Sequence, residues 1–270
     1  MLVVFFYSLI QGFTEFLPIS SQGHLILFNL YFNINEAANI SILEANILVH
    51  LGSLFAVVIY YYRINLNLLL SIKHIPRPDI DQNSTLLINL IVATIPGLIC
   101  GYFFAKFFNY NNDLLILIMG ITSIFFGIIL FIFDKFCLMV KSINEITIKN
   151  SLVIGIFQSF ALIPGVSRSG AVLTSLRLMG FNRNFSVFFS NLLSIPVILG
   201  AVIFLLIQND NILSFNSFNY YKIYLIFFSF ISSLIFIHFF VSWVRKASLA
   251  IFMIYRIIFG IYLIYFFFNI

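Results

Sequence analysis

The chain alternates between long apolar segments and short polar ones. Six apolar segments are long enough, at about 1.5 Å of helical rise per residue, to cross about 30 Å of hydrocarbon. They lie near residues 44–62, 85–104, 113–133, 185–207, 219–241 and 249–268. The pattern predicts six transmembrane helices in an all-α polytopic membrane protein.

Two further apolar stretches, about 1–30 and 151–180, are interrupted near their middle. The first is broken by Pro-Ile-Ser-Ser at residues 18–21, and the second by Pro-Gly-Val-Ser at residues 164–167. Proline removes a backbone donor and glycine loosens the chain. Since such breaks survive at membrane depth only when buried in protein or lining a wet cavity, we interpret each stretch as a re-entrant helix–loop–helix.

Composition supports lipid as the main solvent of this chain. Of its 270 residues, 62% are hydrophobic and 9% are charged, whereas soluble domains carry about 25% charged residues. The net charge of +5 comes mainly from basic loops, so it does not indicate a nucleic-acid partner. Two cysteines far apart in sequence suggest neither a disulfide framework nor a metal cluster.

Basic residues favour alternate loops, which predicts an orientation. The opposite loops contain little more than Lys106 and Lys222. The positive-inside rule therefore places the three richer loops in the cytoplasm and both termini outside, and we expect Arg177 and Arg183 to reach the cytoplasmic surface. The richer loops, which follow the first, third and fifth spans, carry Arg63, Lys73, Arg77, Lys135, Lys141, Lys149, Arg245 and Lys246.

The two halves of the chain resemble each other weakly. Gln11 can be laid on Gln158, Gly52 on Gly200, and the first break on the second with one residue inserted. Each half then has one re-entrant unit and three spans, so the second copy is inverted. Inverted repeats usually place a site near the membrane midplane, built by broken helices. We therefore predict one membrane domain, 1–270, made of repeats at about 1–135 and 150–270.

The first break is flanked by an acid, two hydroxyls and an imidazole. Gln11 and Glu15 are four residues apart and share a helix face. Burying Glu15 in an apolar segment is costly unless a partner or water compensates. Ser20 and Ser21 offer hydroxyls at the break, and His24 lies within one helical turn of Ser21, close enough to share a substrate with it.

The second break combines hydroxyls with one arginine. Gly165, Ser167 and Ser169 surround Arg168 where the next helix begins. Free N–H groups at a helix N-terminus bind anions, and arginine adds charge-assisted hydrogen bonds to phosphate oxygens. Together they suit a phosphate or pyrophosphate. Arg168 lies within an apolar stretch and needs such an anion, or Glu15, as its partner.

Structural interpretations remain open for several of these residues. The four serines at the breaks serve equally well as helix caps and packing residues. His24 and His50 each fit a satisfied buried histidine, and we favour that interpretation for His50. Glu15 and Arg168 also fit a structural ion pair. Arg256 interrupts the last predicted span and has no assigned role.

Transport is the competing function class. Inverted repeats with paired broken helices are a transporter architecture, and an anion exporter or a flippase for a phosphate-bearing lipid would use similar ligands. A carrier, however, needs no general acid or base beside a hydroxyl. The cluster at the first break therefore favours catalysis over transport.

Residues 11–24 and 164–171 resemble the two signatures of the bacitracin-resistance type of undecaprenyl-pyrophosphate phosphatase. The first signature is Glu or Gln, three residues, then Glu-Phe-Leu-Pro-x-Ser-Ser-x-Gly-His, and the second is Pro-Gly-x-Ser-Arg-Ser-Gly-Ala-Thr. The resemblance covers essentially the whole chain. Gln22 replaces the common Thr of the first signature and Val172 the last Thr of the second. Thr174 lies about 200° around a helix from Val172 and is not a simple replacement.

The resemblance implies hydrolysis of undecaprenyl pyrophosphate to the monophosphate and inorganic phosphate, which recycles the carrier lipid for cell-wall synthesis. It also implies the bacterial inner membrane, with the site open to the periplasmic side. A divalent cation, Mg²⁺ or Ca²⁺, is expected at Glu15, with no organic cofactor. Membrane lipid and the lipid substrate are the expected partners, and a homodimer is left open.

The residues support a hypothesis of how this reaction proceeds. Arg168 and the N–H groups of the second broken helix hold the pyrophosphate. Ser21 or a water attacks the terminal phosphorus, His24 or Glu15 handles the proton, and Gln11 orients Glu15 or a water. The candidate catalytic residues are Glu15, Ser21, His24 and Arg168. The candidate substrate-binding residues are Gln11, Ser20, Gly165, Ser167, Ser169 and Thr174.

Overall fold

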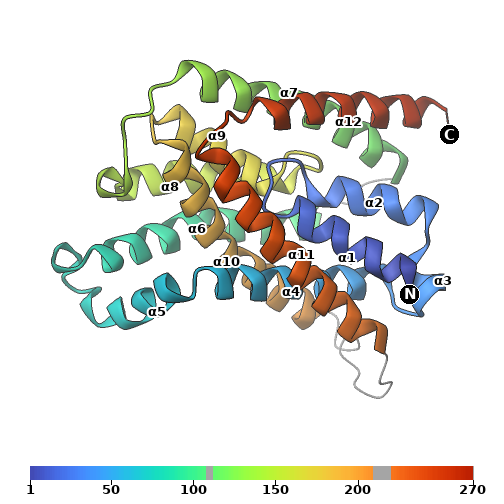
Figure 1. Cartoon of the computed structure of the whole chain (residues 1–270), viewed down its shortest axis with the longest axis horizontal. Helices are drawn as coiled ribbons and strands as arrows, with labels where there is room; N and C mark the ends of the chain where they lie inside the picture. The colour runs from blue at the N-terminus through green and yellow to red at the C-terminus, as the bar shows by residue number, and fades with distance from the viewer. Residues whose placement is uncertain (108–111, 209–219, 270) are drawn as a thin grey trace.

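The computed structural model of the chain describes residues 1–107, 112–208 and 220–269. Throughout these ranges the regular secondary structure is helical, apart from one isolated bridge between Lys141 and Phe181. Many of the helices lie roughly along the long axis of the molecule, whereas α10 and α11 cross the bundle obliquely (Figure 1). The predicted all-α class is confirmed.

Six helices in the described part of the chain are long and apolar enough to cross a membrane. Their ends lie within a few residues of the predicted spans, so this prediction is confirmed as well. The hydrophobic length of each segment set the prediction, because spanning about 30 Å of hydrocarbon needs about 20 apolar helical residues. The helices are α4 (Ile42–Tyr60), α6 (Gln82–Phe107), α7 (Asn112–Phe136), α10 (Arg183–Gln208), α11 (Tyr220–Val244) and α12 (Ala250–Phe268).

The two interrupted stretches each form a pair of shorter helices. The first stretch forms α1 (Leu2–Thr14) and α2 (Ser21–Tyr31), and the second forms α8 (Ile148–Ser159) and α9 (Arg168–Leu178). Both loops are buried by protein, since Phe16, Leu17, Ile19 and Val166 are almost fully covered. Two small helices, α3 (Ile34–Ala38) and α5 (Tyr62–Ser71), connect the remaining elements.

The same unusual backbone conformation occurs at the end of both loops. Ser20 has φ of 69° and Ser167 has φ of 71°, and each is the N-cap of the helix that follows. A positive φ is uncommon for residues other than glycine because Cβ crowds the backbone. Helices α2 and α9 therefore each begin directly after a strained residue with a similar backbone conformation.

Close packing between helices holds these loops in place. Helix α1 packs on α11, α8 on α6, and α7 on α12. At the last contact a Cβ on Gly120 would lie 2.9 Å from the carbonyl oxygen of Gly260, and a Cβ on Gly260 would lie 2.6 Å from that of Gly120. Only glycine permits this approach on both helices. Small residues of this kind let membrane helices gain van der Waals contact that apolar burial alone does not provide.

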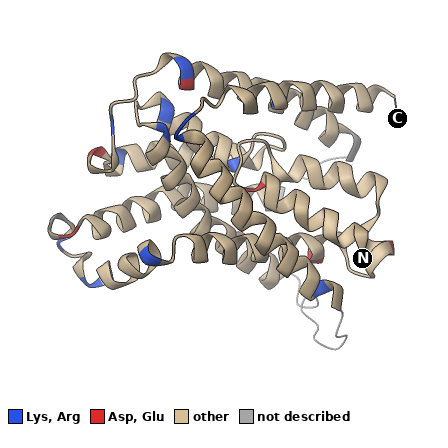
Figure 2. Ribbon diagram, in the orientation of Figure 1, with Lys and Arg blue, Asp and Glu red and all other residues tan. Residues whose placement is uncertain are grey.

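Charged residues are unevenly distributed over the molecule. The loops between α5 and α6 and between α7 and α8 lie at the end opposite both termini (Figure 1), and most Lys and Arg lie on that side (Figure 2). We call this side the basic end. It carries Arg63, Lys73, Lys135, Lys141 and Arg245.

Arg177 corrects one expectation. Instead of reaching the membrane surface, its side chain is 0% exposed, and its Nε lies 3.0 Å from Oδ1 of Asp134. Arg183, which is partly exposed, pairs with the same carboxylate at 2.7 Å. The remaining donors of Arg177 reach carbonyl oxygens of Leu138, Cys137 and Phe181. Asp134 supplies a buried counter-charge, and this ion pair compensates for the lost hydration of the Arg177 guanidinium.

Candidate active site

The carboxylate of Glu15 joins the two broken segments. Glu15 follows α1 and is 8% exposed. Its Oε1 lies 3.1 Å from Nη2 of Arg168. Glu15 was one of the two partners that the sequence suggested for Arg168, the other being a bound anion. Its Oε2 accepts hydrogen bonds from Ser21 Oγ at 2.9 Å and from Gln11 Nε2 at 3.0 Å. One acid therefore contacts the candidate nucleophile and the candidate phosphate ligand.

Arg168 is the first residue of α9 and is anchored by backbone as well as by Glu15. Its Nη1 donates to the carbonyl oxygen of Ser190 at 3.1 Å, and its Nη2 also approaches the Glu15 carbonyl oxygen at 3.4 Å. A guanidinium has five N–H groups in a fixed plane. These contacts leave donors for phosphate oxygens while they fix the plane that would bind them.

The serines of the second loop are part of the scaffold. Ser167 Oγ caps α9 by accepting from the Gly170 N–H at 3.2 Å. Ser169 Oγ donates to the carbonyl oxygen of Leu17 at 2.7 Å, which ties the second loop to the first. The two hydroxyls lie 3.1 Å apart. The capping role considered from sequence therefore applies to Ser167, and a substrate-binding role for Ser167 and Ser169 stays a prediction.

Gly165 allows its loop to lie directly on α7. Its φ is 91°, and a Cβ at this position would lie 2.3 Å from Thr122 Oγ1 and 2.6 Å from the Met119 carbonyl oxygen. Thr122 Oγ1 also donates to the carbonyl oxygen of Pro164 at 2.5 Å. Gly165 is thus required by conformation and by space, and it can contribute only backbone groups to a ligand.

Arg256 holds both loops and was not assigned a role from sequence. It lies on α12 and is 0% exposed. Its Nη1 donates to the Pro18 carbonyl oxygen at 3.4 Å and its Nη2 to that of Gly165 at 3.0 Å, while Nε donates to Ser123 at 3.0 Å. The sequence signal was an arginine inside the last apolar span. Its partners are backbone groups distant in sequence, which no side-chain pattern identifies.

His24 lies in the first turn of α2 but hydrogen-bonds away from Ser21 and Glu15. Its Nδ1 lies 2.7 Å from the Ser20 carbonyl oxygen, and its Nε2 lies 2.6 Å from the Tyr255 hydroxyl. Its ring stacks on Phe259 with 4.0 Å between centroids. Both ring nitrogens are thus engaged, and a catalytic role for His24 stays a prediction.

His50 lies beside the candidate site, where sequence reasoning did not place it. Its Nε2 lies 3.5 Å from Oε2 of Glu15, and its Nδ1 bonds the Asn46 carbonyl oxygen at 2.7 Å. Its side chain is 32% exposed, against 7% for that of Glu15. The available signal was a histidine within the first predicted span, which by itself favours a structural histidine.

Thr174 is bound within its own helix. It is buried, and its Oγ1 donates to the carbonyl oxygen of Gly170 at 2.6 Å. This geometry accounts for the residue without a ligand, and a substrate contact at Thr174 stays a prediction.

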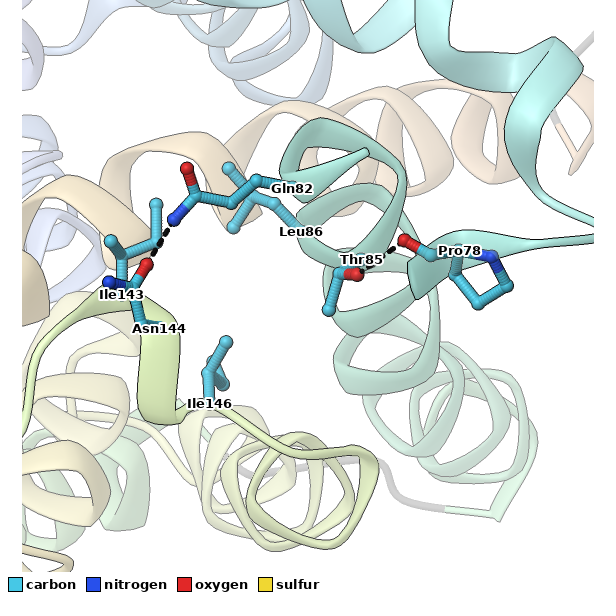
Figure 3. A pocket seen from close by; sticks show the side chains of 7 residues that line it. All are labelled: Pro78, Gln82, Thr85, Leu86, Ile143, Asn144 and Ile146. Atoms are coloured by element: carbon cyan, nitrogen blue, oxygen red, sulfur yellow. Dashed lines mark hydrogen bonds between the residues drawn. The ribbon is translucent and has the colours of Figure 1, made fainter. Parts of the chain in front are cut away.

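A cavity of about 330 Å³ lies at the basic end, apart from the broken segments. Its polar side chains bond protein groups: Gln82 donates to Asn144, and Thr85 to the Pro78 carbonyl oxygen (Figure 3). It contains no charged side chain, so it offers nothing for a pyrophosphate. Its lining is Pro78, Gln82, Thr85, Leu86, Ile143, Asn144 and Ile146.

Comparison with known proteins agrees with this geometry. The undecaprenyl-diphosphatase of Pelagibacter ubique is 38% identical over 97% of this chain and 96% of its own. Those of Aliivibrio salmonicida and Campylobacter curvus are each 37% identical, over 95% and 96% of this chain and 94% and 96% of theirs. The family described as bacitracin resistance protein BacA matches residues 4–262, and the chain belongs to that family.

Proposed function

We propose that this protein hydrolyses undecaprenyl pyrophosphate to undecaprenyl phosphate and inorganic phosphate, and so recycles the carrier lipid for cell-wall synthesis. One observation carries the proposal: a buried carboxylate, Glu15, accepts a hydrogen bond from Ser21 at 2.9 Å and pairs with Arg168 at 3.1 Å. The names of the relatives, undecaprenyl-diphosphatase, point to the same reaction.

Arg168 and the start of α9 bind the pyrophosphate. The free donors of Arg168 meet the terminal phosphate, and the first N–H groups of α9 add partial positive charge. Negative charge spreads over the phosphoryl oxygens as the bond to the bridging oxygen breaks, so the same donors stabilise the transition state more than the ground state. Ser190, Pro18 and Gly165 act indirectly, through the carbonyl oxygens that hold Arg168 and Arg256.

Two nucleophiles fit the space around Glu15. In one route Ser21 Oγ attacks the terminal phosphorus and passes its proton to Glu15, and undecaprenyl phosphate leaves. Water then cleaves the phosphoserine and restores Ser21. In the other route a water attacks directly and Glu15 takes its proton. The hydrogen bond from Ser21 to Glu15 supports Glu15, rather than His24, as the base in the serine route.

The residues around Glu15 fit a divalent cation. Gln11 Oε1 is buried and has no hydrogen-bond partner among the described residues, although its amide nitrogen is bound to Glu15. A carboxylate and an amide oxygen are ligands that Mg²⁺ and Ca²⁺ prefer, and Mg²⁺ sites often use one or two carboxylates with the substrate phosphates. Glu15 and Gln11 would hold the ion, which when bound would neutralise charge on phosphate oxygens.

The interrupted stretches are proposed to be re-entrant, and the halves 1–135 and 150–270 to be inverted repeats. The matching φ values of Ser20 and Ser167 support this arrangement, since each serine follows a proline and precedes a helix. The packing of α1 on α11 and of α8 on α6 also supports it, because those pairs exchange under such a repeat.

The protein is proposed to lie in the bacterial inner membrane with its site open to the periplasmic side. The basic loops at the end opposite both termini support this orientation. Substituted cysteines in the 72–81 loop, on a cysteine-free background, would react only with reagents that cross the membrane. Labelling by an impermeant reagent from outside would reverse the assignment.

Phosphate release from undecaprenyl pyrophosphate by purified protein in detergent tests the function. With Mg²⁺ or Ca²⁺ the wild type should release phosphate, and Glu15→Gln and Arg168→Ala should lower the rate by about 100-fold or more. Glu44→Gln is the matched control, because Glu44 pairs with Lys222 outside the broken segments. If the folded wild type binds the lipid but does not hydrolyse it with any of the cations, transport would be the better-supported function.

A further inference from the structure

A second cavity, of about 460 Å³, lies at the basic end where three long helices have their ends. Helix α4 ends at Tyr60, α10 begins at Arg183, and α11 ends at Val244. The loop at Ser142 and Ile143 closes one side. No residue of the two broken segments lines it, so it is separate from the Glu15 site.

The lining of this cavity is amphipathic. Six apolar side chains form one part of its wall, namely Ile143, Phe185, Val187, Phe188, Val241 and Val244. The polar part consists of Tyr60, Tyr61, Ser142, Asn182, Asn184 and Arg245. A ligand that fills it must therefore combine a polar group with an apolar chain.

The polar part contains one charged side chain, the cation Arg245. Asn182 already bonds Lys141 and Phe185, and the Tyr61 hydroxyl accepts from Asn191. Arg245 has no hydrogen bond or ion pair within the described ranges, and neither does the side chain of Asn184. The free N–H groups of a guanidinium and an amide are suited to bind an anion with several oxygen atoms.

No carboxylate of the described residues forms an ion pair with Arg245. Arg177 and Arg183 share Asp134, which also accepts from the Leu249 N–H. Glu145 accepts from the backbone and the hydroxyl of Ser142. The acids nearest along these loops thus have other partners, and Arg245, which is exposed at the rim of the cavity, has no protein carboxylate as counter-charge among the described residues.

The depth of Arg245 indicates where the anion comes from. It is the first residue after α11, so it lies where a membrane helix meets the headgroup layer. Phosphate groups of lipids occupy that layer, and their acyl chains continue toward the apolar core. We propose that this cavity binds the phosphate headgroup of an anionic membrane phospholipid, with Arg245 on the phosphate and an acyl chain against Phe185, Phe188 and Val241.

The single tryptophan of the chain, Trp243, provides a direct readout two residues from Arg245. Purified full-length protein in detergent is titrated with phosphatidylglycerol brominated on its acyl chains, which quenches nearby tryptophan. Brominated phosphatidylcholine measures quenching by lipid that surrounds the protein without charge selection. The proposal expects saturable quenching by the anionic lipid at concentrations where the zwitterionic lipid gives only a shallow background.

Arg245→Gln should raise the half-quenching concentration of phosphatidylglycerol about tenfold, since charge-assisted hydrogen bonds to the phosphate are lost. Lys246→Gln is the matched control: it removes the neighbouring charge, which does not line the cavity, and should leave the curve unchanged. Inorganic phosphate should not compete at equal concentration, because it lacks the chain.

Equal quenching by the two lipids would overturn the proposal, and so would equal effects of the two variants. Displacement by inorganic phosphate alone would show a free-anion site instead. Size-exclusion profiles establish that both variants are folded. None of these readouts depends on phosphatase activity, so failure here and failure of the proposed function are distinguishable.

Discussion

Arg256 donates a hydrogen bond to the carbonyl oxygen of Gly165 at 3.0 Å, from a helix about 90 residues later in the chain. The same guanidinium reaches the first loop at Pro18. It is therefore the shared support of both breaks. Because charged donors satisfy several buried carbonyl groups at once, their loss is expensive for stability and for loop geometry together.

Arg256→Met is expected to lower the melting temperature and to reduce phosphate release by at least about tenfold, because each charge-assisted hydrogen bond contributes about 1.5–3 kcal/mol. Thermal unfolding in detergent and phosphate release measure the two effects. Ser123→Ala is the control, since it removes only a hydroxyl contact on the same helix pair. Full activity in a folded Arg256→Met protein would show that the loops hold their positions without it.

Gln11→Glu places a second carboxylate beside Glu15. We expect the concentration of Mg²⁺ that gives half-maximal phosphate release to fall about tenfold, because the number of charged ligands tunes affinity for such cations. The equivalent change in the second half, Gln158→Glu, should not alter this concentration, since Gln158 contacts Ala93 and not Glu15. An unchanged cation dependence in Gln11→Glu would argue against Gln11 as a ligand.

Ser21→Ala removes the hydroxyl that donates to Glu15. Release of phosphate should fall by about 100-fold or more if Ser21 is the nucleophile, with the melting temperature within a few degrees of wild type. Ser8→Ala, at a buried serine that bonds the Leu225 carbonyl oxygen, is the control for loss of a hydroxyl elsewhere. Turnover at the wild-type rate in Ser21→Ala would leave water as the nucleophile.

Thr174→Val is expected to cost about 1 kcal/mol of stability and to leave KM for the lipid unchanged, because among the described residues its hydroxyl bonds the Gly170 carbonyl oxygen alone. Steady-state kinetics at several lipid concentrations decide the matter. A severalfold rise in KM would instead restore the substrate contact predicted from the second motif.

Asp134→Asn leaves Arg177 and Arg183 without their shared counter-charge. Since removal of one partner from a buried ion pair costs about 3–5 kcal/mol, we expect a large drop in melting temperature. Glu44→Gln, which breaks the more accessible pair with Lys222, should cost far less. Similar melting temperatures for the two variants would mean that the Asp134 cluster does not stabilise the fold.

The sequence predicted the spans well because hydrophobic length is a local property. It also predicted that Glu15 and Arg168 could pair, and the structure brings Glu15, Ser21 and Arg168 into contact. Polar groups in an apolar segment need such partners. The pairing of Arg177 with Asp134 escaped prediction because the two residues are 43 apart and each lies near a basic loop. Surface exposure was the simpler expectation for Arg177.

The contacts of His50 and Arg256 could not be predicted from sequence for a different reason. The partner of His50 is a carboxylate on another helix, and the partners of Arg256 are main-chain carbonyl oxygens. Such contacts follow from how helices are packed, which hydropathy does not specify. For His24, adjacency in sequence suggested a substrate shared with Ser21, which stays a prediction; in the structure its ring packs on Phe259 of α12.

The backbone of Ser20 bears on why a serine occupies that position. At φ of 69° a glycine would fit with less strain. Unlike Ser167, Ser20 makes no side-chain capping hydrogen bond to the helix that follows it. If fold stability alone determined the residue here, Ser20→Gly would be an improvement. A hydroxyl kept at a conformational cost, and with no bond to the fold within the described chain, is one that a ligand would use.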